Sequence, residues 1–332
     1  QIMAFLYKNK STYEIRNSQA SLTKDMNLAH RFAIGSEWLY FKIYCGVKSA
    51  DMILFDGVRS AMEEMRAKRL IKTFFFIRYL DPEFHLRVRF QLADIAFIGE
   101  AIQVFKKYIK LYEEYGYVNK LQVDTYEREL TRYGLQTMEL SEQLFDVDSI
   151  SILDFLNKTE GDRREELRWL WGIRSIDQLL SDFGLDVTSK MHLLSGLKTA
   201  FHDEFGTDKI VRDDLNNKYR KYRKSFEQIL SGGIEESEIP TELNEIVVKR
   251  SSEVSRIAAS IREKAGDNSD QLLIHLLPSY LHMHINRLVM AKSKFHELVI
   301  YDFLFSYYQS VIKRDKSQQK LINENKKSKE LS

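Results

Sequence analysis

The chain has 332 residues, of which 44% are hydrophobic and 12% aromatic, enough apolar material for a buried core in one large or two smaller units. Its 50 Lys and Arg against 48 Asp and Glu leave a formal net charge of +2, which gives no global field to attract a polyanionic partner. A lone cysteine excludes an internal disulfide, and no segment reaches the roughly 20 apolar residues of a membrane span.

Strand patterns characterise the first part of the chain. Aromatic and β-branched stretches predict four strands, at 38–44, 73–80, 85–92 and about 118–126. Asp81-Pro82 turns the second strand into the third as a hairpin, and Asp94 caps a helix that ends at Gly116. With another helix at about 54–65, the order is β-α-β-β-α-β, which indicates a ferredoxin-like layer. An unrelated α+β arrangement of the same elements is the alternative.

Helical patterns follow Gly134. The helices are predicted at 140–156, 165–183, 188–204, 213–230, 243–264, 270–290 and 295–313, with a loop at 231–241. We therefore predict an α+β protein with an N-terminal antiparallel sheet layer and a mostly helical half. Its parts are an N-terminal extension (1–36), a main domain (37–312, divided into 37–134 and 135–312) and a disordered basic tail (313–332).

A cationic strand follows the Asp81-Pro82 turn. Arg87 and Arg89 are two residues apart in a strand, so they project from the same face, alongside His85. Arg78 can approach the same region if the register of the hairpin allows it. Paired guanidinium groups suit bidentate recognition of a carboxylate or phosphate. The alternative is an exposed cationic face that acidic neighbours balance.

A second cluster lies at residues 122–134, where a strand passes into a helical turn. Glu129 and Arg132 are three residues apart, so they are neighbours on a helix. They are candidates for a functional site. The alternative is a simple surface ion pair.

A third cluster, residues 280–288, lies near the C-terminus. On a helix His282 and Asn286 share a face with Arg287 at its edge, while His284 points about 200° away. This spacing is poor for one metal ion, and an ordinary hydrogen-bonded histidine is the alternative to a functional one. The common nucleotide, serine-hydrolase and zinc-protease motifs do not occur in the sequence. We predict no metal and no cofactor.

Together these segments resemble the elimination domain of lantibiotic dehydratases, which also occurs as a stand-alone thiopeptide-type bacteriocin biosynthesis domain. Six segments match in the family's order over residues 37–310. They are Trp38-Leu-Tyr-Phe-Lys-Ile-Tyr44, Phe75-Phe-Ile-Arg-Tyr-Leu-Asp-Pro82, His85-Leu-Arg-Val-Arg89, Asp124-Thr-Tyr-Glu-Arg-Glu-Leu-Thr-Arg-Tyr-Gly134, Glu142-Gln-Leu-Phe-Asp-Val-Asp-Ser149 and His282-Met-His-Ile-Asn-Arg287. A departure occurs at Leu135, where many relatives have a second glycine, and this puts the local loop in doubt.

The resemblance implies an enzyme that expels glutamate from glutamylated Ser or Thr side chains of a ribosomal precursor peptide. In full-length members a larger N-terminal domain transfers the glutamate from glutamyl-tRNA. We therefore expect a split system, with a separate glutamylating protein and no direct nucleic-acid contact by this chain. The catalytic residues of the family map onto Arg87, Arg89, Arg132 and His282, with Glu129 in support. Whether His282 acts as base or acid is open.

Two other functions are compatible with the same residues. One is a cycloaddition on a dehydrated peptide, as in the related pyridine synthases, for which formation of a macrocycle is the discriminating observation. The other is a non-catalytic subunit that docks the peptide or the glutamylating partner. A homodimer is left open. Because no signal peptide is recognised, a cytoplasmic location is expected. Cys45 is expected to be a small buried residue at the end of a strand.

Overall fold

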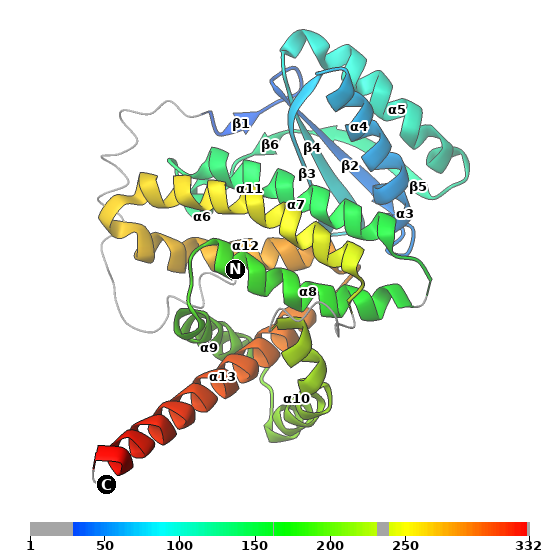
Figure 1. Cartoon of the computed structure of the whole chain (residues 1–332). Helices are drawn as coiled ribbons and strands as arrows, with labels where there is room; N and C mark the ends of the chain where they lie inside the picture. The colour runs from blue at the N-terminus through cyan, green and yellow to red at the C-terminus, as the bar shows by residue number, and fades with distance from the viewer. Residues whose placement is uncertain (1–28, 162, 231–238, 331–332) are drawn as a thin grey trace. The chain divides into compact units, whose positions relative to one another are not determined.

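The structure is a computed structural model that describes residues 29–161, 163–230 and 239–330 (Figure 1). The chain divides into two compact units, residues 1–146 and 147–332. The first contains the strands and the second is helical. The α+β class predicted from the sequence, with an antiparallel sheet followed by a helical half, is confirmed. Within the described residues no helix is both long enough and apolar enough to cross a bilayer.

An antiparallel sheet forms the centre of the first unit. It contains β2 (Trp38–Cys45), β3 (Ile71–Leu80), β4 (Phe84–Leu92) and β5 (Val118–Asp124), in the order β3-β4-β2-β5. The hairpin predicted between the second and third strands is the β3–β4 pair. Cys45 lies buried at the end of β2, and burial raises the pKa of its thiol to about 12.

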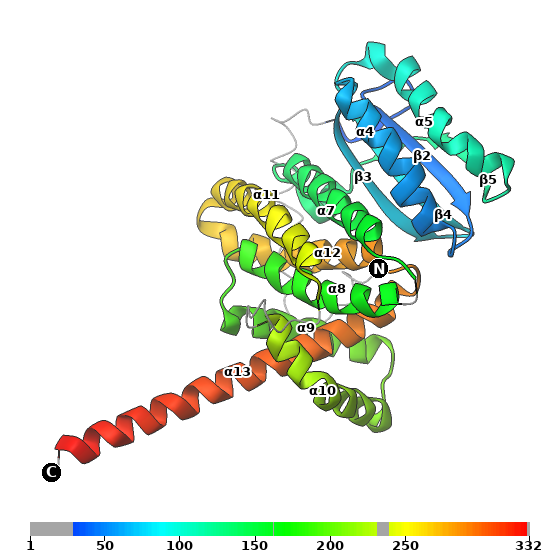
Figure 2. The same cartoon turned by 45° about the vertical axis from the view of Figure 1, so that its right-hand side comes forward.

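Helices cover one face of this sheet (Figure 2). The segments are α3 (Ala50–Met52), the π-helical turn η1 (Ile53–Val58), α4 (Arg59–Ala67), the 3-10 turn η2 (Ile95–Phe97) and α5 (Ile98–Glu114). Phe41 of β2 stacks on Phe105 of α5 with ring centroids 4.0 Å apart. At Gly57 a Cβ would lie 2.9 Å from the Tyr112 ring, so a residue without a side chain lets α5 approach this closely. The apolar alternation of the strands and the amphipathic helices therefore form one core.

The strand predicted at 118–126 is shorter than expected. β5 ends at Asp124, and β6 (Tyr126–Glu127) pairs instead with β1 (Arg31–Phe32) in a separate two-stranded sheet. The rings of Phe32 and Tyr126 stack at 5.8 Å, which shows why residues from the predicted extension join the fold. The rest of that extension, residues 1–28, lies outside the described residues.

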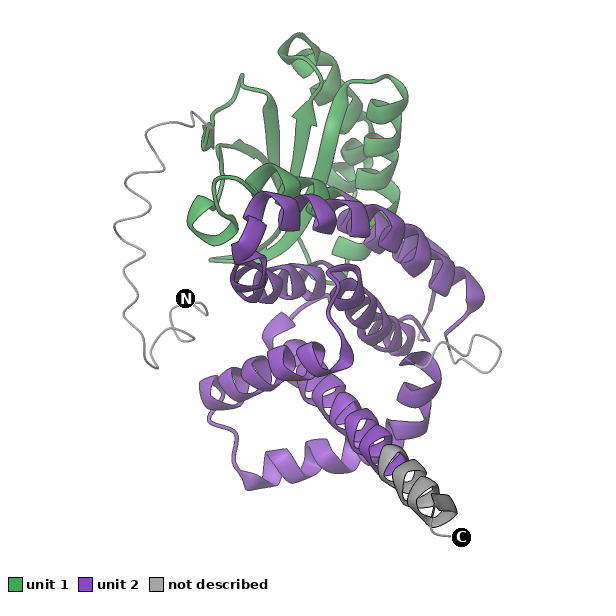
Figure 3. Ribbon diagram, turned by 60° about the vertical axis from the view of Figure 1, so that its left-hand side comes forward, with its two compact units in different colours: residues 1–146 green, residues 147–332 purple. Residues whose placement is uncertain are grey.

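The boundary between the units also differs from the prediction. It falls inside α7 (Met138–Lys158), after Asp146, and not at Gly134 (Figure 3). Phe145 packs against Phe75 of β3 with centroids 5.5 Å apart, and Asp146 forms a 2.5 Å ion pair with Arg66 of α4. These contacts hold the first half of α7 in the sheet unit. They could not be read from the helical pattern, which runs through the boundary without a break.

The second unit is built around α8. After α7, the helices of this unit are α8 (Arg163–Asp182), α9 (Val187–Glu204), α10 (Lys209–Leu230), α11 (Thr241–Ala265), α12 (Ser269–Leu288) and α13 (Ser293–Glu330). α8 contacts α10, α11, α12 and α13. Trp171 of α8 is fully buried, and its indole N–H donates to the Leu243 carbonyl at 2.8 Å. Each helix predicted in this half is present, although residues 231–238 of the predicted loop lie outside the described residues.

The disordered tail predicted at 313–332 is wrong as far as residue 330. α13 continues through Glu330. The segment contains many Lys residues together with Gln and Glu, which all have high intrinsic helix propensities, and this favours continuation of the last helix. The charge and low hydropathy of this segment predicted disorder because such residues gain little from burial. The same residues nevertheless retain their intrinsic preference for the helix.

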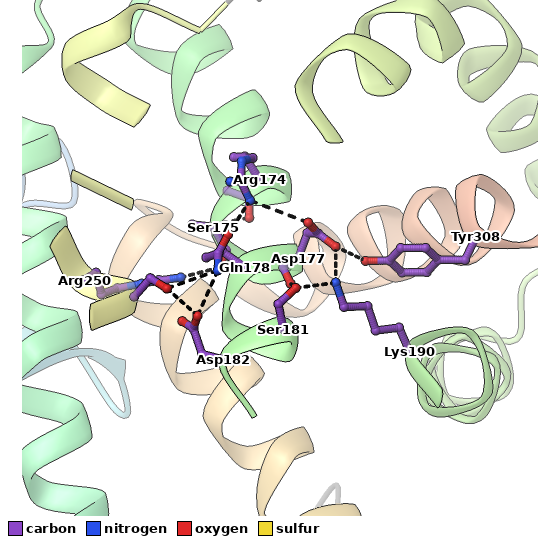
Figure 4. A network of polar contacts seen from close by, with 11 residues as sticks. Arg174, Ser175, Asp177, Gln178, Ser181, Asp182, Lys190, Arg250 and Tyr308 are labelled. Carbon is purple, nitrogen blue, oxygen red and sulfur yellow. Dashed lines mark hydrogen bonds and ion pairs between the residues drawn. The ribbon is translucent and has the colours of Figure 1, made fainter. Parts of the chain in front are cut away.

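Buried polar groups tie the helices of the second unit together (Figure 4). Asp177 of α8 accepts hydrogen bonds from Lys190 Nζ of α9 at 2.6 Å and from the Tyr308 hydroxyl of α13 at 2.5 Å. Lys190 also donates to Ser181 Oγ at 2.7 Å. Burial, and then the Asp177 charge, hold the pKa of Tyr308 well above its ordinary value. Because each buried charge has an opposite partner, this network joins three helices at tolerable desolvation cost.

Candidate active site

One face of the sheet carries the predicted cationic strand. In the β2–β4 register Tyr40 lies opposite Arg89, Lys42 opposite Arg87 and Tyr44 opposite His85. Side chains alternate along a strand, so Arg87 and Arg89 project from the same face, as predicted. We call this the cationic face, defined by Lys42, Arg87 and Arg89.

Arg89 is buried and surrounded by aromatic rings. Its guanidinium carbon lies 4.4 Å from the ring centroid of Tyr40, 4.9 Å from that of Tyr126 and 5.2 Å from that of Phe75. Only 7% of the residue is exposed, and its Nε has no hydrogen-bond partner. Among the described residues it forms no ion pair with a carboxylate. Burial accordingly lowers the pKa of Arg89. We call the three rings the Arg89 cage.

Such a residue is unusual, because buried cations in proteins are normally paired. The cage supplies cation–π attraction to the guanidinium group, worth up to about 2 kcal/mol when desolvated, but no negative charge. The arrangement is therefore suited to an anion brought by a ligand.

Arg87 is held in place by its neighbours on the same face. Its guanidinium carbon lies 3.3 Å from the Tyr79 ring centroid, and its Nε donates to His85 Nε2 at 3.1 Å. His85 Nδ1 in turn donates to the Glu83 carbonyl oxygen at 2.8 Å. Burial, with a contribution from Arg87, lowers the pKa of His85. His85 is thus a neutral acceptor that orients Arg87, and it adds no positive charge to the face.

Lys42 is neutralised within the unit, because it forms an ion pair with Asp124 of β5. Burial alone would raise the pKa of Asp124, but the hydrogen bonds from Lys42 and the Thr125 backbone N–H outweigh it, so that pKa is lowered. Arg87 and Arg89 remain as the cations of this face without a carboxylate partner in the described part of the chain.

Arg78 does not share the cationic face. The β3–β4 register places it opposite Leu86, whose side chain points to the helix-covered side. There Arg78 forms a buried ion pair with Asp51 of α3 at 2.6 Å. Arg78 was predicted to approach this face only if the register of the hairpin allowed it, and the observed register does not.

Arg132 and Glu129 form the predicted pair. Arg132 belongs to α6 (Leu130–Tyr133), and its Nη1 lies 3.0 Å from Glu129 Oε2. The side chains are 28% and 58% exposed, so the pair is accessible to an incoming ligand. An ordinary surface ion pair between residues three apart on a helix has the same geometry.

A buried carboxylate behind the Arg89 cage was not identified as such from the sequence. Glu142 of α7 binds Arg128 through both oxygens, each at 2.7 Å, and accepts a hydrogen bond from the Tyr126 hydroxyl at 2.8 Å. Glu142 therefore holds one ring of the cage. The signal was its position in the matching segment 142–149, but the spacing to Arg128 gives no indication of the contact.

His282 lies on α12 in the second unit. Its side chain is 25% exposed, and its Nδ1 lies 2.8 Å from Oε1 of Glu297 on α13. Glu297 is 1% exposed and was missed by the sequence reasoning. The only signal was a glutamate in the first turns of the last predicted helix.

His284 and Arg287 belong to a buried cluster around Asp148 of α7. Asp148 Oδ1 lies 2.7 Å from His284 Nδ1, and Asp148 Oδ2 accepts from Arg287 Nη1 at 3.1 Å. Arg250 Nη1 lies 3.3 Å from Asp148 Oδ1. These attractions overcome the burial that would raise the pKa of Asp148 and hold it well below its ordinary value. Asn286 is half-buried on α12, one turn after His282.

The predicted residues are thus divided between the units. The first contains Arg87, Arg89, Glu129 and Arg132, and the second contains His282 with the newly identified Glu297. Within the described ranges, no group of three or more His, Cys, Asp or Glu side chains is arranged to hold a metal ion.

Comparison with known proteins identifies relatives. The family model described as "Lantibiotic biosynthesis dehydratase C-term" matches residues 38–308. The subtilin biosynthesis protein SpaB of Bacillus subtilis is 27% identical over 259 residues, which are 76% of this chain and 24% of SpaB. The chain therefore spans about a quarter of the length of that relative.

Two solved structures share the fold. The tRNA-dependent lantibiotic dehydratase MibB from Microbispora sp. 107891 matches with a TM-score of 0.67 and 20% identity, over 85% of this chain and 29% of MibB. The pyridine synthase TbtD from thiomuracin biosynthesis matches with a TM-score of 0.60 and 13% identity, over 83% of this chain and 99% of TbtD. At these identities the likeness shows the fold alone.

Proposed function

Because the chain belongs to the lantibiotic biosynthesis dehydratase C-terminal family, as the match over residues 38–308 shows, we propose that it eliminates glutamate from glutamylated Ser or Thr side chains of a ribosomal precursor peptide. The product is dehydroalanine or dehydrobutyrine, together with free glutamate. The resemblance found in the sequence is confirmed at the level of the family.

The observation that carries this proposal is the pair of arginines on the cationic face. Arg89 is buried in its cage with no carboxylate partner among the described residues, and His85 orients Arg87 beside it. In the reaction the Cα proton is removed, its electron pair forms the Cα=Cβ bond, and the Cβ–O bond breaks as glutamate leaves as a carboxylate. A leaving carboxylate is an anion that guanidinium groups can bind through two hydrogen bonds.

Roles follow from these demands. Arg87 and Arg89 bind glutamate carboxylates or the negative charge that develops in the transition state. Arg132, oriented by Glu129, adds a third cation to the same task. We assign proton transfer to His282, since imidazole exchanges protons readily near neutral pH.

The substrate of this reaction already carries glutamate. We therefore propose that glutamylation is performed by a polypeptide outside these 332 residues, and that this polypeptide, not the present chain, binds glutamyl-tRNA. MibB is a tRNA-dependent dehydratase by its description, and this chain matches 29% of it.

The test supplies the purified chain with a chemically glutamylated Ser peptide and follows the peptide mass. We expect loss of glutamate together with the Ser oxygen, and a decrease of roughly 10²- to 10⁴-fold in His282→Ala. His192→Ala, an exposed histidine of α9, is the matched control and retains the parental rate. A parental chain that leaves the peptide unchanged contradicts elimination by this chain alone and favours a docking subunit.

A second candidate is cycloaddition. The observation in its favour is that the structural match covers 99% of the pyridine synthase TbtD. Incubation with a dehydrated peptide tests this candidate, because a macrocyclic product supports cycloaddition and an unchanged dehydrated peptide contradicts it.

A further inference from the structure

The contact between His282 and Glu297 shows which ring nitrogen of the imidazole carries the proton. A carboxylate has only acceptor atoms, so the 2.8 Å contact requires a proton on His282 Nδ1. The other oxygen of Glu297 accepts a hydrogen bond from the Tyr301 hydroxyl at 3.3 Å. Both oxygens of this buried carboxylate are therefore engaged, and its position is determined by two helices.

This arrangement leaves Nε2 with the lone pair in the neutral imidazole. Within the described part of the chain Nε2 has no hydrogen-bond partner, and the side chain is 25% exposed. Nε2 is thus the atom that can accept a proton from a molecule outside the protein.

His284, two residues later, provides an internal comparison. Its Nδ1 also pairs with a carboxylate, that of Asp148 at 2.7 Å, but its Nε2 lies 2.6 Å from Ser175 Oγ. Only 1% of its side chain is exposed. Both histidines have a carboxylate on Nδ1, but only His282 offers Nε2 to a substrate.

We propose that Glu297 is a positioning residue that makes His282 the base of the reaction, with Nε2 as the proton acceptor. This inference rests on the proposed elimination. The Cα proton moves to Nε2, the Cα–H electron pair forms the Cα=Cβ bond, and glutamate departs from Cβ with the electrons of the Cβ–O bond. The Glu297 carboxylate balances the imidazolium that forms, as a carboxylate does behind a catalytic histidine.

The first measurement is the tautomer of His282, read from ¹⁵N NMR of the full chain with labelled histidine. We expect the neutral ring to carry its proton on Nδ1. In Glu297→Gln the Tyr301 hydroxyl engages the amide oxygen, so the amide N–H faces Nδ1 and the proton moves to Nε2. Tyr301→Phe keeps the carboxylate and is expected to keep the Nδ1–H form. A parental His282 protonated on Nε2 overturns the inference, whether or not the chain eliminates glutamate.

The second measurement is the rate. Glu297→Gln is expected to lower kcat by roughly 10²- to 10⁴-fold with little change in KM, because the lone pair needed for proton abstraction is misplaced. Glu166→Gln, the same change at an exposed position of α8, is expected to retain the parental kcat. Parental kcat in a folded Glu297→Gln variant overturns the inference. Absence of elimination in the parental chain refutes the proposed function instead, since the tautomer reports on Glu297 separately.

Discussion

Arg89→Met is expected to lower the rate of glutamate elimination by roughly 10²- to 10³-fold while leaving the free energy of unfolding unchanged within about 1 kcal/mol, or raising it. The rate falls because a preorganised donor for the leaving carboxylate is removed. Stability is retained because the lost group is a desolvated cation that has no carboxylate partner in the part of the chain that the structure describes, and methionine fills the same aromatic cage. A residue whose removal affects rate and not stability is kept for function.

Peptide mass and urea denaturation measure the two effects on the same preparation. Arg220→Met, at an exposed position of α10, is the matched control and is expected to change neither quantity. Arg89→Lys retains the charge but loses the planar fork, so an intermediate rate is expected. Elimination at the parental rate in Arg89→Met refutes the assignment, and so does a loss of several kcal/mol of stability, which would make Arg89 a structural residue.

Asp148→Asn is expected to lower the free energy of unfolding by about 3–5 kcal/mol. Asp148 is the carboxylate shared by Arg250, Arg287 and His284, which are 2%, 1% and 1% exposed. Its loss removes the negative charge that these buried guanidinium groups share. Asp203→Asn, at an exposed position of α9, is the control. Equal urea midpoints for the parental chain and Asp148→Asn would show that the cluster is dispensable.

The stabilising contribution of Asp148 is expected to depend on pH. The pKa of Asp148 is depressed in the folded chain, so its contribution is present above the unfolded value of about 3.9 and is lost as the pH falls through the folded value. The stability difference between the parental chain and Asp148→Asn is therefore expected to be constant from neutral pH to about pH 5 and to shrink below about pH 4. A stability difference that grows on acidification would contradict a pKa of Asp148 that is depressed in the folded chain.

The sequence by itself determined what depends on local periodicity. Alternation in strands placed Arg87 and Arg89 on one face, and apolar spacing located the helices of the second unit, because both patterns are properties of a single element. The ordered motifs identified the family, which the match over residues 38–308 confirmed.

Contacts between elements were decided only by the tertiary structure. The hairpin register sent Arg78 to the other face, and burial made His85 a neutral support for Arg87. Glu297 meets His282 across two helices, and the Asp148 cluster joins residues more than 100 positions apart. No spacing in the sequence encodes such a pair, because the partner of a charged side chain depends on which surfaces the apolar cores bring together. The sequence therefore determined the elements and their candidate cations, and the packing of the elements decided which of those charges are balanced within the protein.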